Sequence, residues 1–184
     1  MYKIILLFFI PVVFYAQSGK LINIVDGDTI VLSTKGKNII CQMGEIDTPE
    51  IVLNSKLKRE MKECNFSKDK FIKLGNISHN FAKSILKIGQ TYEYYVYDYT
   101  RSKNPICKIK LPKGLRVEIR PTFDEIMVSE GYALPYVVKS KPDQLKLFLK
   151  IAKDAKQQKY GLWKENYDLM QCLVEHRYSL RTLR

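Results

Sequence analysis

Three short stretches near the beginning of the chain alternate apolar and polar residues and are separated by tight turns. They occupy residues 20–25, 29–33 and 37–43. Alternation with a period of two is typical of a strand that buries one face. The first turn contains Asp26-Gly27 and the second contains Lys35-Gly36, and in a tight hairpin glycine supplies a positive φ. The pattern therefore predicts three successive strands joined by hairpins.

Further along the chain, apolar residues at helical spacing alternate with β-rich stretches. We expect two more strands at residues 91–97 and 105–111, and three helices at residues 77–87, 123–130 and 142–159. The lysine-rich residues 51–70 show weak periodicity, so we expect a solvated loop there with at most a short helix. Gly131 stands where the second helix should end. Five strands with about three helices predict an α+β fold, a five-stranded OB-fold β-barrel with helical additions.

The chain begins with the features of a secretory signal peptide. A short charged start is followed by residues 4–14, which carry no charge and are too few to span a membrane. Cleavage after Ser18 places two small side chains, Ala16 and Ser18, at the preferred positions, whereas cleavage after Ala16 would place Phe14 at one of them. We expect residues 1–18 to be removed, with an uncleaved membrane anchor as the alternative. The mature protein is then secreted or periplasmic, without stable membrane insertion.

The remaining length suits one domain, which we place at residues 19–164. A C-terminal extension follows at residues 165–184, whose apolar spacing suits a helix but to which we assign no chemistry. The 184-residue chain has 31 Lys and Arg against 19 Asp and Glu, a net charge of +12. This excess favours a polyanionic partner, either nucleic acid or an anionic membrane surface, and charge alone does not choose between them. We expect a monomer.

Four cysteines permit disulfides in an oxidising compartment, and four thiols allow three complete pairings. Cys41 and Cys107 fall on expected strands, where they are equally well explained as small buried apolar residues. Cys64 and Cys172 lie in less regular stretches, so we favour a bond between these two. None of the four is spaced like a zinc site.

Two segments combine carboxylates with residues that constrain the backbone: V-D-G-D-T around Asp28 and I-D-T-P-E around Asp47. Because Thr48 precedes a proline, its backbone is extended and its carbonyl lies outside any helical hydrogen-bond ladder. Asp28, Asp47 and the Thr48 carbonyl make an all-oxygen set that suits a hard divalent cation, and Glu50 is placed to hold a water. Taken singly, the first segment is also an ordinary hairpin turn and the second an ordinary helix start.

V-D-G-D-T followed by I-D-T-P-E resembles the thermonuclease (staphylococcal nuclease-like) family, and the order of elements is similar from about residue 20 to about residue 163. The resemblance implies an OB-fold nuclease that cleaves DNA and RNA with Ca²⁺ and little sequence preference. It implies that Asp28, Asp47 and the Thr48 carbonyl bind the Ca²⁺ and that Glu50 handles the attacking water. It also places Tyr99 and Tyr136 where the family stacks nucleobases.

Two arginines of the family's catalytic set are not matched in this sequence. The first position is occupied by Gln42. The second is Asn104 if the following strand is aligned, and lies at or beside Arg101 if the preceding aspartate is aligned. A neutral amide brings no charge to a phosphodiester transition state, so we expect Arg101 to be the catalytic cation. We interpret three further cations as solvated surface charges: Lys56, Lys58 and Arg59.

Three functions are compatible with these residues. The first is a secreted Ca²⁺-dependent nuclease that acts on DNA and RNA. The second is an OB-fold nucleic-acid-binding protein whose catalytic site is weakened by Gln42 and Asn104. The third is an adhesive basic surface protein that meets nucleic acid incidentally. An assay of DNA cleavage with and without Ca²⁺ separates the first two.

Overall fold

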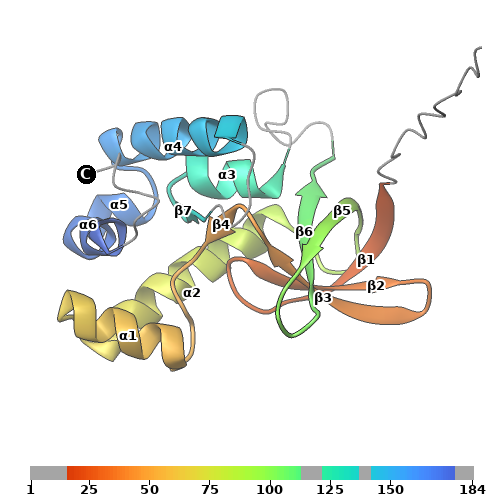
Figure 1. Cartoon of the computed structure of the whole chain (residues 1–184), viewed down its shortest axis with the longest axis horizontal. Helices are drawn as coiled ribbons and strands as arrows, with labels where there is room; N and C mark the ends of the chain where they lie inside the picture. The colour runs from red at the N-terminus through yellow and green to blue at the C-terminus, as the bar shows by residue number, and fades with distance from the viewer. Residues whose placement is uncertain (1–15, 113–121, 137–141, 177–184) are drawn as a thin grey trace, which may run out of the picture.

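The strands form a closed barrel at one end of the molecule (Figure 1). The computed structural model describes residues 16–112, 122–136 and 142–176. The barrel strands follow the order β1-β2-β3-β6-β5, and their bounds are β1 Gln17–Ile24, β2 Thr29–Thr34, β3 Lys37–Met43, β5 Thr91–Tyr99 and β6 Pro105–Lys110. Neighbouring strands are antiparallel except for β3 and β6, which are parallel. The predicted α+β fold with a five-stranded OB-fold barrel is confirmed.

The predicted hairpins between β1, β2 and β3 are present, but their two turns use glycine for different reasons. Between β2 and β3, Lys35 and Gly36 have φ angles of 48° and 74°, so both central residues are left-handed, as a two-residue hairpin requires. Gly27 does not have a positive φ, and the expectation that it would is wrong. A Cβ at Gly27 would lie 2.5 Å from Ser78 Oγ and 2.8 Å from Thr48 Oγ1. Glycine is needed there because two other segments pack against it.

The described residues form six helices rather than about three. Their bounds are α1 Ser55–Cys64, α2 Lys68–Ile85, α3 Phe123–Ser129, α4 Pro142–Gln157, α5 Leu162–Glu165 and α6 Tyr167–Glu175. The short helix allowed for at residues 51–70 is present as α1, but the expected solvated loop is wrong for most of this stretch, because α1 and the first turn of α2 occupy it. In α1, Leu57 is the one fully buried apolar residue, so the helix leaves only a weak periodic signal in the sequence.

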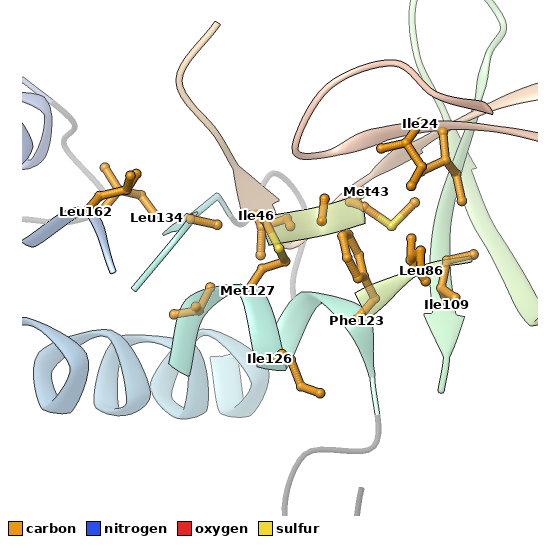
Figure 2. Close-up of a cluster of buried hydrophobic side chains, with 14 of the residues drawn as sticks. Ile24, Met43, Ile46, Leu86, Ile109, Phe123, Ile126, Met127, Leu134 and Leu162 are labelled. Carbon is orange, nitrogen blue, oxygen red and sulfur yellow. The ribbon is translucent and has the colours of Figure 1, made fainter. Parts of the chain in front are cut away.

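Helix α3 packs between the barrel and the other helices. Thr122 and Glu125 form a capping box that begins it, and Gly131, with a φ of 77°, follows its C-cap as predicted. Figure 2 shows Phe123 and Met127 of α3 among apolar side chains of the barrel and of two short strands, β4 (Ile46–Asp47) and β7 (Leu134–Pro135). Phe123 and Met127 are fully buried, and truncating a buried Phe costs about 3–5 kcal/mol. This core therefore holds the β4–β7 pair against the barrel.

Two disulfide bonds join parts of the fold that are distant in sequence. Cys64 at the end of α1 is bonded to Cys172 of α6, which confirms the pairing we favoured. Cys41 and Cys107 are bonded to each other between β3 and β6, so the reading of these two as merely small buried residues is wrong. They meet because β3 and β6 are neighbours in the barrel, which the alternation within each strand does not reveal.

Part of the signal-peptide prediction lies outside the described residues, which begin at 16. Gln17 and Ser18 already belong to β1, where they pair with Tyr94 and Glu93. Cleavage after Ser18 therefore stays a prediction, and in the structure these two residues are part of the barrel. Residues 177–184 of the C-terminal extension also lie outside the described residues. Within the described residues, every helix is too short or too polar to cross a membrane.

Candidate functional site

Asp28 is positioned by the turn between β1 and β2. The Asp28 N–H donates to Asp26 Oδ1 at 3.0 Å, and the Val25 N–H donates to Thr29 O at 2.8 Å. One carboxylate oxygen of Asp28 accepts a hydrogen bond from Thr29 Oγ1 at 3.1 Å, and the other accepts one from the Thr48 N–H at 2.7 Å. This last bond joins the two carboxylate-bearing segments that the sequence singled out.

The segment from Asp47 to Glu50 is held on one side by a strand and on the other by a helix. Asp47 of β4 is paired with Leu134 of β7. The Pro49–Glu50 backbone lies directly against α2, where a Cβ at Gly75 would stand 2.3 Å from Glu50 O. Thr48 is buried between these elements. The backbone of the site is therefore fixed by packing, and Gly75 makes the close approach possible.

The Lys56 ammonium lies among the oxygens of this segment. It donates a short hydrogen bond to Asp47 Oδ1 and another to the Thr48 carbonyl at 2.9 Å. Its distance to Glu50 Oε1 is 2.8 Å. The side chains of Lys56, Asp47 and Glu50 are 23%, 16% and 18% exposed. Asp47, Thr48 and Glu50 thus meet at one positive charge, and the fourth residue of the predicted metal and water site, Asp28, is joined to them by the hydrogen bond that it accepts from the Thr48 N–H.

Asn54 connects the start of α1 to the site. Its Oδ1 accepts a hydrogen bond from the Leu57 N–H at 2.9 Å, which makes Asn54 the N-cap of the helix. Its Nδ2 donates to Glu50 Oε2 at 2.6 Å. One side chain therefore starts the helix that carries Lys56 and also orients the carboxylate of Glu50.

The Asp28 carboxyl is electrostatically unusual. Burial raises its pKa well above the ordinary value of 3.8, and the neighbouring charges of Asp47 and Asp26 raise it further. The Lys56 charge and the hydrogen bond from the Thr48 N–H act in the opposite direction. The ionised form of Asp28 is therefore disfavoured in the folded protein, and a cation bound beside it would offset that cost.

The donors fit a hard divalent cation. Asp28 and Asp47 offer carboxylate oxygens and Thr48 offers a carbonyl oxygen, which is the ligand chemistry of Ca²⁺ and Mg²⁺. The Lys56 ammonium donates hydrogen bonds to two of these oxygens, Asp47 Oδ1 and Thr48 O, so this part of the structure already stabilises a positive charge.

Gln42 pairs with Thr29, whose hydroxyl donates to Asp28, whereas Arg101 and Asn104 lie in the turn between β5 and β6. Gln42 is exposed at the end of β3, and Arg101 is exposed in the turn between β5 and β6. Asn104 closes that turn through its backbone, donating to Thr100 Oγ1 at 3.0 Å. Within the described part of the chain, Arg101 has no hydrogen bond or ion pair with the site carboxylates.

The two tyrosines predicted to contact nucleobases are exposed, and they lie on different elements. Tyr99 ends β5 and is 63% exposed, whereas Tyr136 follows β7 and is 44% exposed. The Tyr136 N–H donates to Glu45 O at 2.9 Å, which places it beside the chain that leads into β4. Their contact with nucleic acid stays a prediction.

The family model described as staphylococcal nuclease homologue matches residues 41–165, about two thirds of the chain. The chain belongs to this family. The match includes Asp47, Thr48 and Glu50 but begins after Asp28. In the structure Asp28 is joined to the matched segment by the hydrogen bond that it accepts from the Thr48 N–H. The staphylococcal nuclease homologues are in general phosphodiesterases that act on nucleic acids. A search of curated proteins found no match.

Sequence reasoning about this staphylococcal nuclease homologue missed Asn54, Lys56 and Gly75. The reading of Lys56 as a solvated surface charge is wrong, because its ammonium is paired with two carboxylates. An asparagine three residues before the apolar Leu57 is a helix-start signal, and it would have placed Lys56 in the first turn of a helix beside the D-T-P-E segment. No local pattern points to Gly75, since its role depends on the segment that packs against it.

Proposed function

We propose that this staphylococcal nuclease homologue is a secreted or periplasmic enzyme that uses Ca²⁺ to hydrolyse phosphodiester bonds in DNA and RNA. The observation that best supports the proposal is the convergence of Asp47, the Thr48 carbonyl and Glu50 on one positive charge, with Asp28 bonded to the same segment. Membership of the family supports the class of reaction. Removal of residues 1–18 belongs to the same proposal, and N-terminal sequencing of exported protein tests it.

In this proposal Asp28, Asp47 and the Thr48 carbonyl hold the Ca²⁺, which supplies positive charge to a phosphoryl oxygen when it is bound. Glu50 orients or deprotonates the attacking water. The hydrogen bond from Asn54 holds Glu50 Oε2. The other oxygen, Oε1, faces the Lys56 ammonium. A water held by Glu50 then has a defined direction of attack, and holding reactants in the correct geometry lowers the entropic part of the barrier.

The proposed enzyme needs a cation to replace the family's two arginines. Gln42 and Asn104 are neutral, and loss of a phosphate-clamping arginine lowers rates by roughly 10³-fold in other phosphoryl-transfer enzymes. Arg101 stands in an exposed turn at the barrel rim and is our candidate for this role. Tyr99 and Tyr136 are our candidates for stacking on nucleobases.

The experiment that tests the proposal is a cleavage assay on plasmid DNA and on RNA, with added Ca²⁺ or with a chelator. We expect cleavage only with Ca²⁺, and loss of cleavage in Asp28→Ala. Glu63→Gln is the matched control, because it removes an exposed carboxylate of α1 and should cleave normally. Cleavage that is unaffected by both the chelator and Asp28→Ala would contradict the proposal.

The second candidate is a nucleic-acid-binding protein with a weakened catalytic site, and the neutral residues Gln42 and Asn104 favour it. It predicts salt-sensitive binding of DNA without cleavage. Gln42→Arg separates the two functions. Cleavage that appears only in Gln42→Arg supports the weakened enzyme, whereas cleavage by the native protein that is lost in Arg101→Ala supports the enzyme proposed above.

A further inference from the structure

The Lys56 ammonium lies against three oxygens of one short segment, two of which accept a hydrogen bond from it and one of which forms an ion pair with it. The three oxygens are Asp47 Oδ1, the Thr48 carbonyl at 2.9 Å and Glu50 Oε1 at 2.8 Å. An ammonium has three donors, so a single lysine can hold several oxygens at once. The side chains of Lys56, Asp47 and Glu50 are each less than a quarter exposed, so solvent screens their charges less than it would on an open surface.

We propose that Lys56 is an internal counter-ion, whose ammonium holds Asp47, Thr48 and Glu50 together and has to be displaced before a divalent cation can bind the same oxygens. The inference rests on the proposed function, because it assumes that Asp47 and the Thr48 carbonyl are cation ligands. In this inference the Lys56 ammonium competes with the divalent cation for the same oxygens.

The position of Lys56 on α1 supports a specific role. Lys56 lies in the first turn of the helix, where the helix dipole disfavours a positive charge, and that turn contains no acidic residue. The unfavourable placement is offset by two carboxylates that come from outside the helix. The helix itself is anchored by the buried Leu57 and by the disulfide at Cys64, so the ammonium is delivered to the site by a fixed element.

The inference predicts that removing the ammonium strengthens cation binding. We expect Lys56→Met to bind Ca²⁺ at least about tenfold more tightly than the native protein in isothermal titration calorimetry. Lys58→Met is the matched control, because it removes the same charge from an exposed position on the same helix. Its affinity should change by no more than about twofold, as expected for screened surface charge.

Thermal unfolding provides a second measurement that does not depend on catalysis. In a chelator, Lys56→Met should unfold at a lower temperature than the native protein, because Asp47 and Glu50 repel each other without their counter-ion. Added Ca²⁺ should then raise its unfolding temperature more than that of the native protein, since stabilisation by a ligand grows with its affinity. Lys56→Gln, which keeps a donor for the Thr48 carbonyl, serves if Lys56→Met fails to fold.

The outcomes separate this inference from the proposed function. Equal Ca²⁺ affinity in the native protein and in Lys56→Met would overturn the inference and leave the nuclease proposal standing. The same gain in Lys56→Met and Lys58→Met would also overturn it, because a general charge effect would then suffice. If no form of the protein binds Ca²⁺, both the inference and the Ca²⁺-dependent nuclease proposal fail.

Discussion

At the scale of single residues, the most deeply buried carboxyl among the described residues, Asp124, lies outside the proposed site. Asp124 is the second residue of α3 and is completely buried. Burial raises its pKa from 3.8 to about 7, and the nearby Glu45 carboxylate contributes in the same direction. The Lys108 charge, which is 2.8 Å from Glu45 Oε2, opposes the shift. Asp124 is therefore protonated in the folded protein at pH values where it would be charged in the unfolded chain.

This makes the stability of the protein depend on pH. Because the folded state binds the proton more tightly, the stabilising contribution of Asp124 is fully present below about pH 4 and is lost as the pH rises through about 7. We expect Asp124→Asn to flatten this dependence between pH 5 and pH 8 in urea unfolding, with the largest gain in stability at pH 8. Asp143→Asn, an exposed change on α4, should follow the native curve. A native slope in Asp124→Asn would contradict the assignment.

Gly75 matters because the Glu50 backbone packs directly against it. Helix propensity alone favours Ala over Gly by about 1 kcal/mol. A Cβ at this position would nevertheless lie 2.3 Å from Glu50 O and 2.6 Å from Glu50 C, so the Glu50 backbone has to move. We expect Gly75→Ala to lower cleavage activity at least about tenfold. The free energy of unfolding should fall by about 3 kcal/mol at most.

Activity and urea unfolding of the same protein preparation measure the two effects of Gly75→Ala. Ser84→Ala, on an exposed face of α2, is the control for a small change elsewhere on the helix. Full activity in Gly75→Ala would show that the site tolerates a shift of the Glu50 backbone, against our expectation.

At the scale of elements, the start of α1 links helix stability to the geometry of Glu50. Asn54 caps the helix with its oxygen and donates to Glu50 with its nitrogen. We expect Asn54→Ala to lose both contacts, with about 1 kcal/mol of stability and much of the activity. Asn54→Asp keeps the cap oxygen but has no donor for Glu50. It should therefore retain stability while losing activity about as strongly as Asn54→Ala.

Chemical unfolding and cleavage assays of the two Asn54 variants separate these roles. If Asn54→Asp keeps full activity, the bond from Asn54 does not orient Glu50 for the catalytic role that we propose for it. The native protein is the reference for both measurements, since the two variants differ in whether the cap is retained and in the negative charge that Asp places beside Glu50.

At the scale of the whole molecule, two disulfides close long loops of the chain. Cys41–Cys107 spans 66 residues and Cys64–Cys172 spans 108 residues. In the chain-entropy model, bonds of this span each destabilise the unfolded state by up to about 4–5 kcal/mol. The first bond closes the barrel between β3 and β6, and the second ties α6 to α1.

The two bonds should differ in their response to a reductant. Cys41 and Cys107 are fully buried, whereas Cys64 and Cys172 are partly exposed. Because thiol exchange requires access to a sulfur, we expect mild reductant to open Cys64–Cys172 first. Alkylation followed by mass spectrometry measures the order. Reduction of Cys41–Cys107 first would contradict this prediction.

The sequence by itself determined the barrel, the helices α3 and α4, and the two carboxylate-bearing segments. These features are local: alternating strands, hairpin glycines, the Gly131 helix stop and the V-D-G-D-T and I-D-T-P-E motifs are each written in a few consecutive residues. Only the tertiary structure decided the roles of Gly27 and Gly75 and the Cys41–Cys107 bond. Each of these depends on which distant segment packs alongside, and close approach between two backbones leaves no periodic trace in either one.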